Sequence, residues 1–427
     1  MAAVTPCPGA GASQFHLRDG SLWCEDVAVA DLAARFGTPL YVYSAEAMRA
    51  RLREVRQAFG PDAAVCFAVK ANSNLHILKL LYGEGCGFDL VSGGELERLR
   101  VVGLSPEQSV FAGVAKQRWE LESAVAANLM FVNVESRHEL STLSAVGAAA
   151  GARVRVALRV NPGVDPGTHA FISTGQKGSK FGVSMRCAGE LVAAICEDPW
   201  LELVGYHVHL GSQLRSVEPY RQALDRVLDF VDGDARRADG VRYYDLGGGF
   251  GISYGDGDAL EVSAVGAALL PDLKRRGWTP VVEPGRYLIG DAGILLTSVL
   301  GEKAQDNDRF VLVDAAMNDL IRPALYQAEH PIVPVRHRLR APEHVVDVVG
   351  PVCESGDFLG RKRSLPSLVA GDLLAVLAAG AYGSSMASTY NSRPRPAEVM
   401  VDGGVAKLVR RRETFQRMFE DELEAQS

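Results

Sequence analysis

The sequence has few cysteines, no excess of basic residues and no long hydrophobic run. Its seven cysteines are an odd number, without a CxxC pair or a metal-finger spacing. This usage is typical of a reducing compartment, so we predict a cytoplasmic protein with no disulfide framework and no metal. The net charge of −7 provides no basic face for nucleic acid. No stretch reaches the roughly 18 apolar residues that cross a bilayer, so no membrane partner is expected.

Short β-branched runs alternate with segments of helical spacing through the middle of the 427-residue chain. The runs cover residues 64–70, 87–92, 109–113, 129–134, 153–161, 201–209, 241–249 and 279–285. Eight strand–helix units in about 240 residues are the size and rhythm of a (β/α)8 barrel. The sequence therefore predicts an α/β fold of TIM-barrel type, with a doubly wound sheet as the competing interpretation.

The regions on either side of this pattern are rich in short strands and turns. Such runs occur at residues 39–44 and repeatedly after residue 290. We predict a (β/α)8 barrel domain over residues 44–290 and a mostly β domain over residues 21–43 and 291–427, to which an N-terminal strand contributes. Residues 1–20 are predicted to be a flexible tail.

Polar side chains close several of the predicted barrel strands, where barrel enzymes carry their chemistry. Lys70 closes the first strand and Glu283 the eighth, while His207 and His209 close the sixth. An apolar strand that delivers a lysine into a pocket favours its neutral, nucleophilic form. Each residue taken alone also has a structural interpretation: Lys70 as a surface lysine, His209 as a core histidine and Glu283 as a carboxylate paired with an arginine.

A glycine-rich run, DLGGGFG at residues 245–251, follows the seventh predicted strand. Its bare N–H groups could bind a phosphate, and barrel enzymes often bind phosphate after strands seven and eight. The order is not GxGxxG and no Lys-Ser/Thr pair follows, so nucleotide binding is disfavoured. A lysine, a phosphate loop, a ring-stacking histidine and a buried carboxylate together predict a pyridoxal 5'-phosphate (PLP) site.

At this point the sequence resembles the diaminopimelate decarboxylases, which are PLP enzymes of the alanine racemase-like barrel class. The matching stretches are FAVKANSN (67–74), DLVSGGEL (89–96), RVNPG (159–163), THAFISTGQKGSKFG (168–182), HVHLGSQ (207–213), DLGGGFG (245–251), EPGRYL (283–288), MNDLIRPALY (317–326), GPVCESGD (350–357) and GAYGSSMASTYNSRPRPAEV (380–399). The resemblance implies a carboxy-lyase that converts meso-2,6-diaminopimelate to L-lysine and CO2, the last step of lysine biosynthesis.

The resemblance also implies roles for individual residues. Lys70 would bind PLP covalently, His209 would stack on the pyridine ring, Glu283 would hold the ring nitrogen protonated, and Cys353 would donate a proton as the second catalytic residue. The cofactor-binding set is Lys70, Asp89, His209, Ser212, Gly247, Gly248, Gly249, Glu283, Pro284, Gly285, Arg286 and Tyr382. The substrate-binding set is Arg286, Arg322, Tyr326, Glu354 and Tyr382. A homodimer with shared active sites is implied, in which Cys353 and Glu354 come from the other subunit.

Three alternatives remain open. A sister enzyme would decarboxylate ornithine, lysine, carboxynorspermidine or a carrier-bound glutamyl group. An amino-acid racemase on the same fold would be expected to have an arginine at the position of Glu283 and a tyrosine in place of Cys353. A regulator without activity would have lost Lys70, Glu283 or Cys353.

Overall fold

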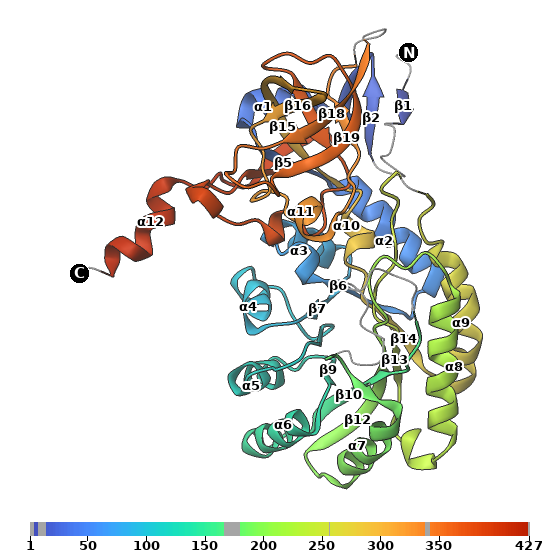
Figure 1. Cartoon of the computed structure of the whole chain (residues 1–427). Coiled ribbons are helices and arrows are strands. Elements are labelled where there is room, and N and C mark those ends of the chain that lie inside the picture. The colour runs from blue at the N-terminus through green and yellow to red at the C-terminus, as the bar shows by residue number, and fades with distance from the viewer. Residues whose placement is uncertain (1–3, 7–13, 166–179, 256, 338–341, 426–427) are drawn as a thin grey trace. The chain divides into compact units, whose positions relative to one another are not determined.

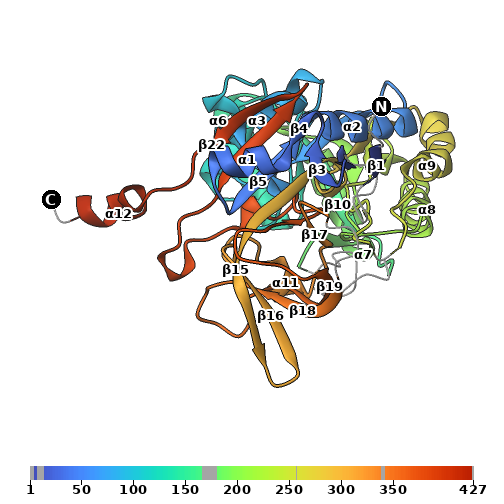
Figure 2. The ribbon, with the colours of Figure 1, turned by 90° about the horizontal axis from the view of Figure 1, so that it is seen from above.

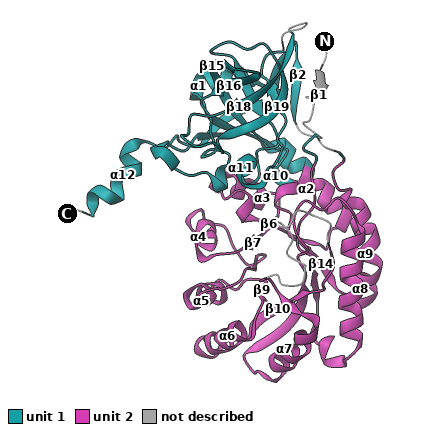
Figure 3. Cartoon of the chain, viewed as in Figure 1, with its two compact units in different colours: residues 1–50, 253–257, 288–427 teal, residues 51–252, 258–287 magenta. Residues whose placement is uncertain are grey.

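A computed structural model describes residues 4–6, 14–165, 180–255, 257–337 and 342–425 of the chain. The chain divides into two compact units (Figure 3). Unit 1 comprises Met1–Ala50, Ser253–Gly257 and Leu288–Ser427, and unit 2 comprises Arg51–Ile252 and Asp258–Tyr287. Each unit is described by itself below.

Unit 2 contains a closed barrel of parallel strands, as the alternating pattern predicts (Figure 1). The strands are β6 (Ala64–Ala68), β7 (Gly87–Leu90), β8 (Val110–Phe111), β9 (Phe131–Val134), β10 (Val154–Asn161), β12 (Leu201–His207), β13 (Tyr243–Asp245) and β14 (Thr279–Val282). Each pairs with its neighbour in the order β10-β12-β13-β14-β6-β7-β8-β9, and the pairing of β10 with β9 closes the ring. The predicted (β/α)8 barrel is thus confirmed.

A helix follows almost every barrel strand. The helices are α3 (Leu75–Gly83), α4 (Gly93–Val101), α5 (Arg118–Ala126), α6 (Arg137–Ala150), α7 (Met185–Glu197), α8 (Glu218–Asp232) and α9 (Val262–Arg276), while α2 (Ala45–Phe59) precedes β6. Several begin at a polar residue whose side chain accepts an N–H of the first turn, as Ser92 does from Glu95 and Ser136 from Glu139. Figure 1 shows α4, α5 and α6 on one side of the barrel and α8 beside α9 on another.

Several observed strands are shorter than the predicted runs, since β8, β12, β13 and β14 end at Phe111, His207, Asp245 and Val282. Two further differences lie at the ends of β6 and β10. Strand β6 ends at Ala68, and Lys70 lies in a 3-10 turn, η1 (Val69–Ala71). A short strand that the pattern did not predict, β11 (Val183–Ser184), pairs with the end of β10. The barrel interior is packed rather than hollow, because six strands each supply one buried residue to a common cluster of Cys66, Val110, Phe131, Ala157, Val204 and Val281.

Unit 1 is built on a largely antiparallel sheet in the order β19-β18-β16-β15-β5-β21-β22, with β20 and β17 paired beside it. Its strands are β5 (Leu40–Ser44), β15 (Gly293–Gln305), β16 (Asp308–Val313), β17 (Ile332–Pro334), β18 (Glu343–Val349), β19 (Phe358–Pro366), β20 (Leu373–Val376), β21 (Ala397–Asp402) and β22 (Val405–Arg410). Figure 2 shows the long β15–β16 hairpin. The predicted N-terminal strand is β5, which pairs with β15 and β21.

The N-terminal region departs from the prediction of a flexible tail over residues 1–20. Strands β1 (Val4–Pro6), β2 (Phe15–Arg18), β3 (Ser21–Cys24) and β4 (Val27–Ala28) form a small antiparallel sheet. Phe15 is buried in the core of unit 1 together with Leu22 and Val42. An aromatic side chain in a core orders its strand, so the prediction is wrong for residues 15–18.

Unit 1 also contains the helices α1 (Val29–Phe36), α11 (Arg322–Tyr326) and the C-terminal α12 (Phe415–Glu424). A four-residue helix, α10 (Arg286–Ile289), links the end of the barrel to this unit along the chain. Across the described ranges, every helix is too short or too polar to pass through a bilayer.

Close packing between α9 and α2 yields a test of the fold. A Cβ at Gly266 would lie 2.0 Å from the carbonyl oxygen of Ala58, so this helical glycine is required by contact. We expect Gly266→Ala to lower the free energy of unfolding by about 1–3 kcal/mol, measured by urea denaturation. Gly83→Ala is the matched control, because nothing lies within 4 Å of a Cβ there. It should be neutral or stabilising by up to about 1 kcal/mol, and equal losses in both variants would contradict the packing argument.

Candidate active site

Lys70 and Asp89 form an ion pair at the carboxyl ends of adjacent strands. The Nζ of Lys70, in the turn after β6, donates to Oδ2 of Asp89 on β7. Asp89 is fully buried, whereas the Lys70 side chain is 36% exposed. Burial and the nearby Glu283 raise the pKa of Asp89, and Lys70 opposes that rise. The amine is therefore held at the barrel mouth and remains reachable from solvent.

Glu283 places a second carboxylate in the same mouth, directly after β14. The residue is 3% exposed. Its Oε2 lies 3.4 Å from Nε2 of His207, and no described residue offers Oε1 a hydrogen bond. Burial alone would raise the pKa of Glu283, but His207, Lys70 and His209 lower it below its usual range. Glu283 is thus an anion with one buried oxygen that no N–H group of the described residues reaches.

The glycine-rich run passes between two other strand ends with no room for side chains. A Cβ at Gly248 would lie 2.2 Å from the carbonyl oxygen of Glu283, and one at Gly249 would lie 2.3 Å from that of Gly211. Gly247 and Gly249 have φ values of +71° and +86°, which favour glycine. The run therefore brings bare backbone to the barrel mouth, as an anion-binding loop requires.

His209 adjoins this loop. Its Nδ1 accepts the N–H of Gly248 at 3.2 Å. Desolvation and the cations Arg159 and Lys70 lower the pKa of His209 well below its usual range. The imidazole is accordingly neutral, with Nδ1 as the acceptor, and its ring plane is fixed by the loop that it contacts.

Three further predicted residues lie beside these groups. A Cβ at Gly285 would meet the Cβ atoms of Ala68 and Ala71 at 3.0 and 3.1 Å, so Gly285 allows β6 and η1 to pass closely. The carbonyl of Pro284 accepts the N–H of Ala68 at 3.4 Å. The buried guanidinium of Arg286 donates to Oγ of Ser212 at 3.0 Å, which joins the loops after β14 and β12.

The remaining predicted residues lie in unit 1. Arg322, at the start of α11, is 5% exposed and donates to Nε2 of His330 and to the hydroxyl of Tyr254, each at 3.2 Å. Its guanidinium also lies over the ring of Tyr326, 6.0 Å from the centroid. A guanidinium presents five N–H donors, and two of them can bind one carboxylate.

Cys353 and Glu354 lie on an exposed loop of unit 1. The N–H of Cys353 donates to Oδ1 of Asn391 at 3.0 Å. Asp357 fixes the conformation of this loop, because its two oxygens accept the N–H groups of Met317 and Val352, both at 2.7 Å. The sequence pattern does not predict this role. The only sequence signal for it is its place at the end of CESGD.

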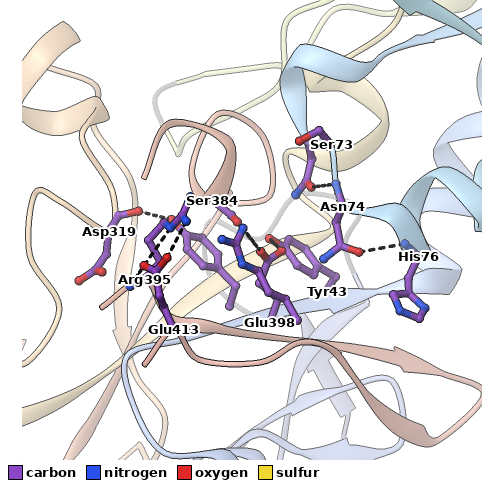
Figure 4. Close-up of polar contacts among 12 residues, drawn as sticks. Tyr43, Ser73, Asn74, His76, Asp319, Ser384, Arg395, Glu398 and Glu413 are labelled. Atoms are coloured by element: carbon purple, nitrogen blue, oxygen red, sulfur yellow. Dashed lines mark hydrogen bonds and ion pairs between the residues drawn. The ribbon is translucent and has the colours of Figure 1, made fainter. Parts of the chain in front are cut away.

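Tyr382 sits in a loop that buried polar groups fix. Its φ is +56°, an uncommon value for a residue with a side chain. Two residues on, Oγ of Ser384 donates to Oε1 of Glu398 at 2.6 Å, and the hydroxyl of Tyr43 donates to Oε2 of the same carboxylate at 2.9 Å (Figure 4). Glu398 is 1% exposed. This acid on β21 ties the Tyr382 loop to β5.

The structure therefore collects the predicted barrel residues at the carboxyl ends of β6, β7, β12, β13 and β14. Of the resembling stretch 168–182, residues 168–179 lie outside the described part of the chain. Sequence reasoning noted His207 only as a strand-end histidine and assigned no role to Asp245. Both are buried beside Glu283. Their signal was position: each ends a barrel strand.

The residues present fit PLP. Among enzymes on this kind of barrel, those that use PLP need a partner for the pyridine nitrogen, and the unsatisfied Oε1 of Glu283 can accept its N–H. The glycine run provides backbone for the phosphate, and Lys70 provides an amine for the aldehyde. We therefore place the protein in the class of PLP-dependent barrel enzymes.

Comparison with known proteins narrows this class. The family described as "Pyridoxal-dependent decarboxylase, pyridoxal binding domain" matches residues 45–290. A diaminopimelate decarboxylase of Pseudomonas aeruginosa is 47% identical over 96% of this chain and 98% of its own, and one of Aquifex aeolicus is 45% identical over 96% and 97%. The crystal structure of the Helicobacter pylori diaminopimelate decarboxylase complexed with L-lysine is 38% identical, covers 93% of this chain and 99% of that one, and has a TM-score of 0.88. The chain belongs to the pyridoxal-dependent decarboxylase family, and within it to the diaminopimelate decarboxylases.

Removal of the Lys70 amine provides a direct test of the site. Lys70→Ala should lose the visible absorbance of covalently bound PLP and all measurable turnover, because the substitution removes the amine that would bind the cofactor. Lys79→Ala, on the exposed face of α3, is the control and should retain both. Retention of the visible band in Lys70→Ala, measured by absorbance of the purified holoenzyme, would exclude Lys70 as the attachment point.

Glu95 makes the stability of this region depend on pH. Its Oε2 accepts the N–H of Val91 at 2.8 Å. Burial raises its pKa from 4.5 to about 7. The folded state thus binds this proton more tightly than the unfolded state, so the stability it contributes is lost as pH rises from 4.5 through about 7. A shift of this size corresponds to about 3 kcal/mol.

We expect Glu95→Gln to abolish that dependence and to be more stable than wild type above neutral pH, since the amide oxygen still accepts from Val91. Urea denaturation at several pH values measures the difference. The control is Glu97→Gln, whose side chain is exposed on the same helix. Parallel stability profiles for Glu95→Gln and wild type would show that Glu95 titrates normally.

Proposed function

We propose that the protein is a carboxy-lyase that converts meso-2,6-diaminopimelate to L-lysine and CO2, the last step of lysine biosynthesis, with PLP as cofactor. The observation that carries the proposal is the buried anion Glu283, with one unsatisfied oxygen, at the same barrel mouth as Lys70. Racemases of this fold are expected to have a cation there. The full-length similarity to diaminopimelate decarboxylases supports the choice of substrate.

The charge state of each site residue suits it to a different part of the cofactor. Bound PLP supplies an electron sink for the electron pair left on Cα when CO2 departs. The Glu283 carboxylate would hold a proton on the pyridine nitrogen, and its low pKa ensures that it is ionised at neutral pH. The neutral ring of His209 offers a flat face beside the phosphate loop. The Gly247–Gly249 backbone and Ser212 are proposed to bind the phosphate, with Asp89 holding Lys70 in place.

The substrate is a diacid with two amines, and the proposed binding residues are matched to it. We assign its carboxylates to Arg286 and Arg322, since guanidinium groups grip carboxylates with two hydrogen bonds. Tyr326 and Tyr382 would line the same site, and Glu354 would contact the distal amino group.

A homodimer with shared active sites forms the second part of the proposal. Cys353 and Glu354 are exposed in the single chain. An acid that protonates a carbanion must be shielded from bulk water, and a second subunit is proposed to cover this loop and to receive the Cys353 thiol in its own site. The cytoplasmic location remains a prediction from cysteine usage.

Release of CO2 from candidate substrates is the test of function. We would offer meso-diaminopimelate, L-lysine, L-ornithine and L-glutamate separately to the PLP-loaded protein. Release from diaminopimelate alone, with L-lysine as the product, is expected. Release from lysine or ornithine instead would assign a sister activity. Bound PLP with no release from any of the four would direct the search to a carrier-bound substrate.

The shared active site predicts complementation between two inactive variants. Cys353→Ala should retain PLP and lose turnover by about 100-fold or more, because the proton donor is absent. After subunit exchange with Lys70→Ala, half of the dimers are mixed, and each mixed dimer holds one site with both residues. Roughly a quarter of wild-type activity should return. Absence of recovery, with exchange verified by mass spectrometry, would place Cys353 and Lys70 of one chain in the same site.

A further inference from the structure

Three buried ionisable side chains meet at the carboxyl ends of β12, β13 and β14. His207 and Asp245 end adjacent barrel strands and are register partners, and Glu283 follows the next strand. Their exposed fractions are 1%, 0% and 3%. One nitrogen or oxygen atom of each lies within 4.8 Å of the others. The proposed function uses only Glu283, so the other two require an explanation.

Two ionised carboxylates cannot share such a place at low cost. Like charges in a buried site raise the proton affinity of one partner, so the Asp245–Glu283 pair holds one proton at neutral pH. Oδ1 of Asp245 accepts the N–H of Gly247 at 2.9 Å. No described residue donates a hydrogen bond to Oδ2, although this oxygen is buried. An unsatisfied buried oxygen next to a carboxylate is the position for an O–H donor.

The surroundings decide which carboxyl keeps the proton. Six ionisable side chains face Glu283 from β6, η1, β7, β12, the loop after it, and β13: Cys66, Lys70, Asp89, His207, His209 and Asp245. His207 and Lys70 favour an ionised Glu283, and Nε2 of His207 lies 3.4 Å from Oε2 of Glu283. Burial and the charge of Glu283 raise the pKa of Asp245 well above its usual range. Geometry and charge therefore agree that the proton lies on Asp245.

We propose that Asp245 is a positioning residue that stays protonated, directs its O–H to Glu283 and, together with His207, keeps Glu283 ionised and oriented for the pyridine nitrogen. This inference rests on the proposed function of Glu283. The proposal gives Asp245 two contacts. Its Oδ1 accepts the N–H of Gly247, which fixes the glycine loop, and its O–H orients the Glu283 carboxylate.

The conservative variant separates this role from a charged one. Asp245→Asn preserves the acceptor for Gly247 and offers an N–H where the neutral acid offers an O–H. It should keep the PLP dissociation constant within about threefold of wild type, measured by fluorescence titration of the cofactor-free protein. Asp245→Ala should weaken PLP binding by about ten- to hundredfold. The exposed Asp229→Ala is the control and should match wild type.

An infrared measurement tests the protonation state of Asp245 directly. It requires neither enzymatic activity nor a folded Asp245→Ala variant. The difference spectrum between wild type and Asp245→Asn at neutral pH, on cofactor-free protein, should contain the carbonyl band of one neutral carboxylic acid. Loss of a carboxylate band instead would overturn the proposal, as would an asparagine variant as weak in PLP binding as the alanine variant.

Two other results bear on the outcome. Stoichiometric metal in the purified holoenzyme, lost in Asp245→Asn, would overturn the proposal, because a cation among the three groups would ionise both carboxyls. If the infrared band is present but the protein binds no PLP, the protonation of Asp245 stands, and it is the proposed function of Glu283 that fails.

Discussion

The structure of the site depends on a buried negative charge. Glu283 is an anion in a barrel mouth from which water is largely excluded, and such a charge is stable only among compensating groups. His207 at the end of β12 and Lys70 after β6 provide this compensation. The barrel is what brings them together, since the carboxyl ends of parallel strands converge at one rim. The charge that makes the cofactor useful is thus also the hardest group to accommodate in the fold.

A second constraint is the absence of side chains where strands and loops cross. Gly248 passes the carbonyl of Glu283 at a distance that allows no side chain, and Gly285 passes Ala68 and Ala71 closely enough that a side chain there would crowd them. These contacts place the backbone of the glycine run, His209 and Glu283 in fixed relation, so that geometry and charge are set by the same residues. In unit 1 buried acids do similar work: Glu398 fixes the Tyr382 loop and Asp357 the Cys353 loop.

Much of the fold was readable from the sequence because its signals are local. The eight apolar runs became the eight barrel strands, and residues 39–44 contained the strand that joins the second sheet. The prediction failed where local composition misleads. The N-terminal residues look flexible, yet Phe15 is buried against residues far along the chain. The sequence also extended the first strand to Lys70, whereas the chain turns after Ala68.

The sequence by itself determined the class of chemistry, since Lys70, the glycine run and Glu283 each close a strand of a barrel whose rhythm is visible in the residues. It could not decide the state of these groups. The unsatisfied oxygen of Glu283, the neutral ring of His209 and the pairing of Asp245 with Glu283 were decided by tertiary structure. The physical reason is that charge state depends on burial and on neighbours from strands distant in sequence, whereas strand and turn propensities act between residues close along the chain.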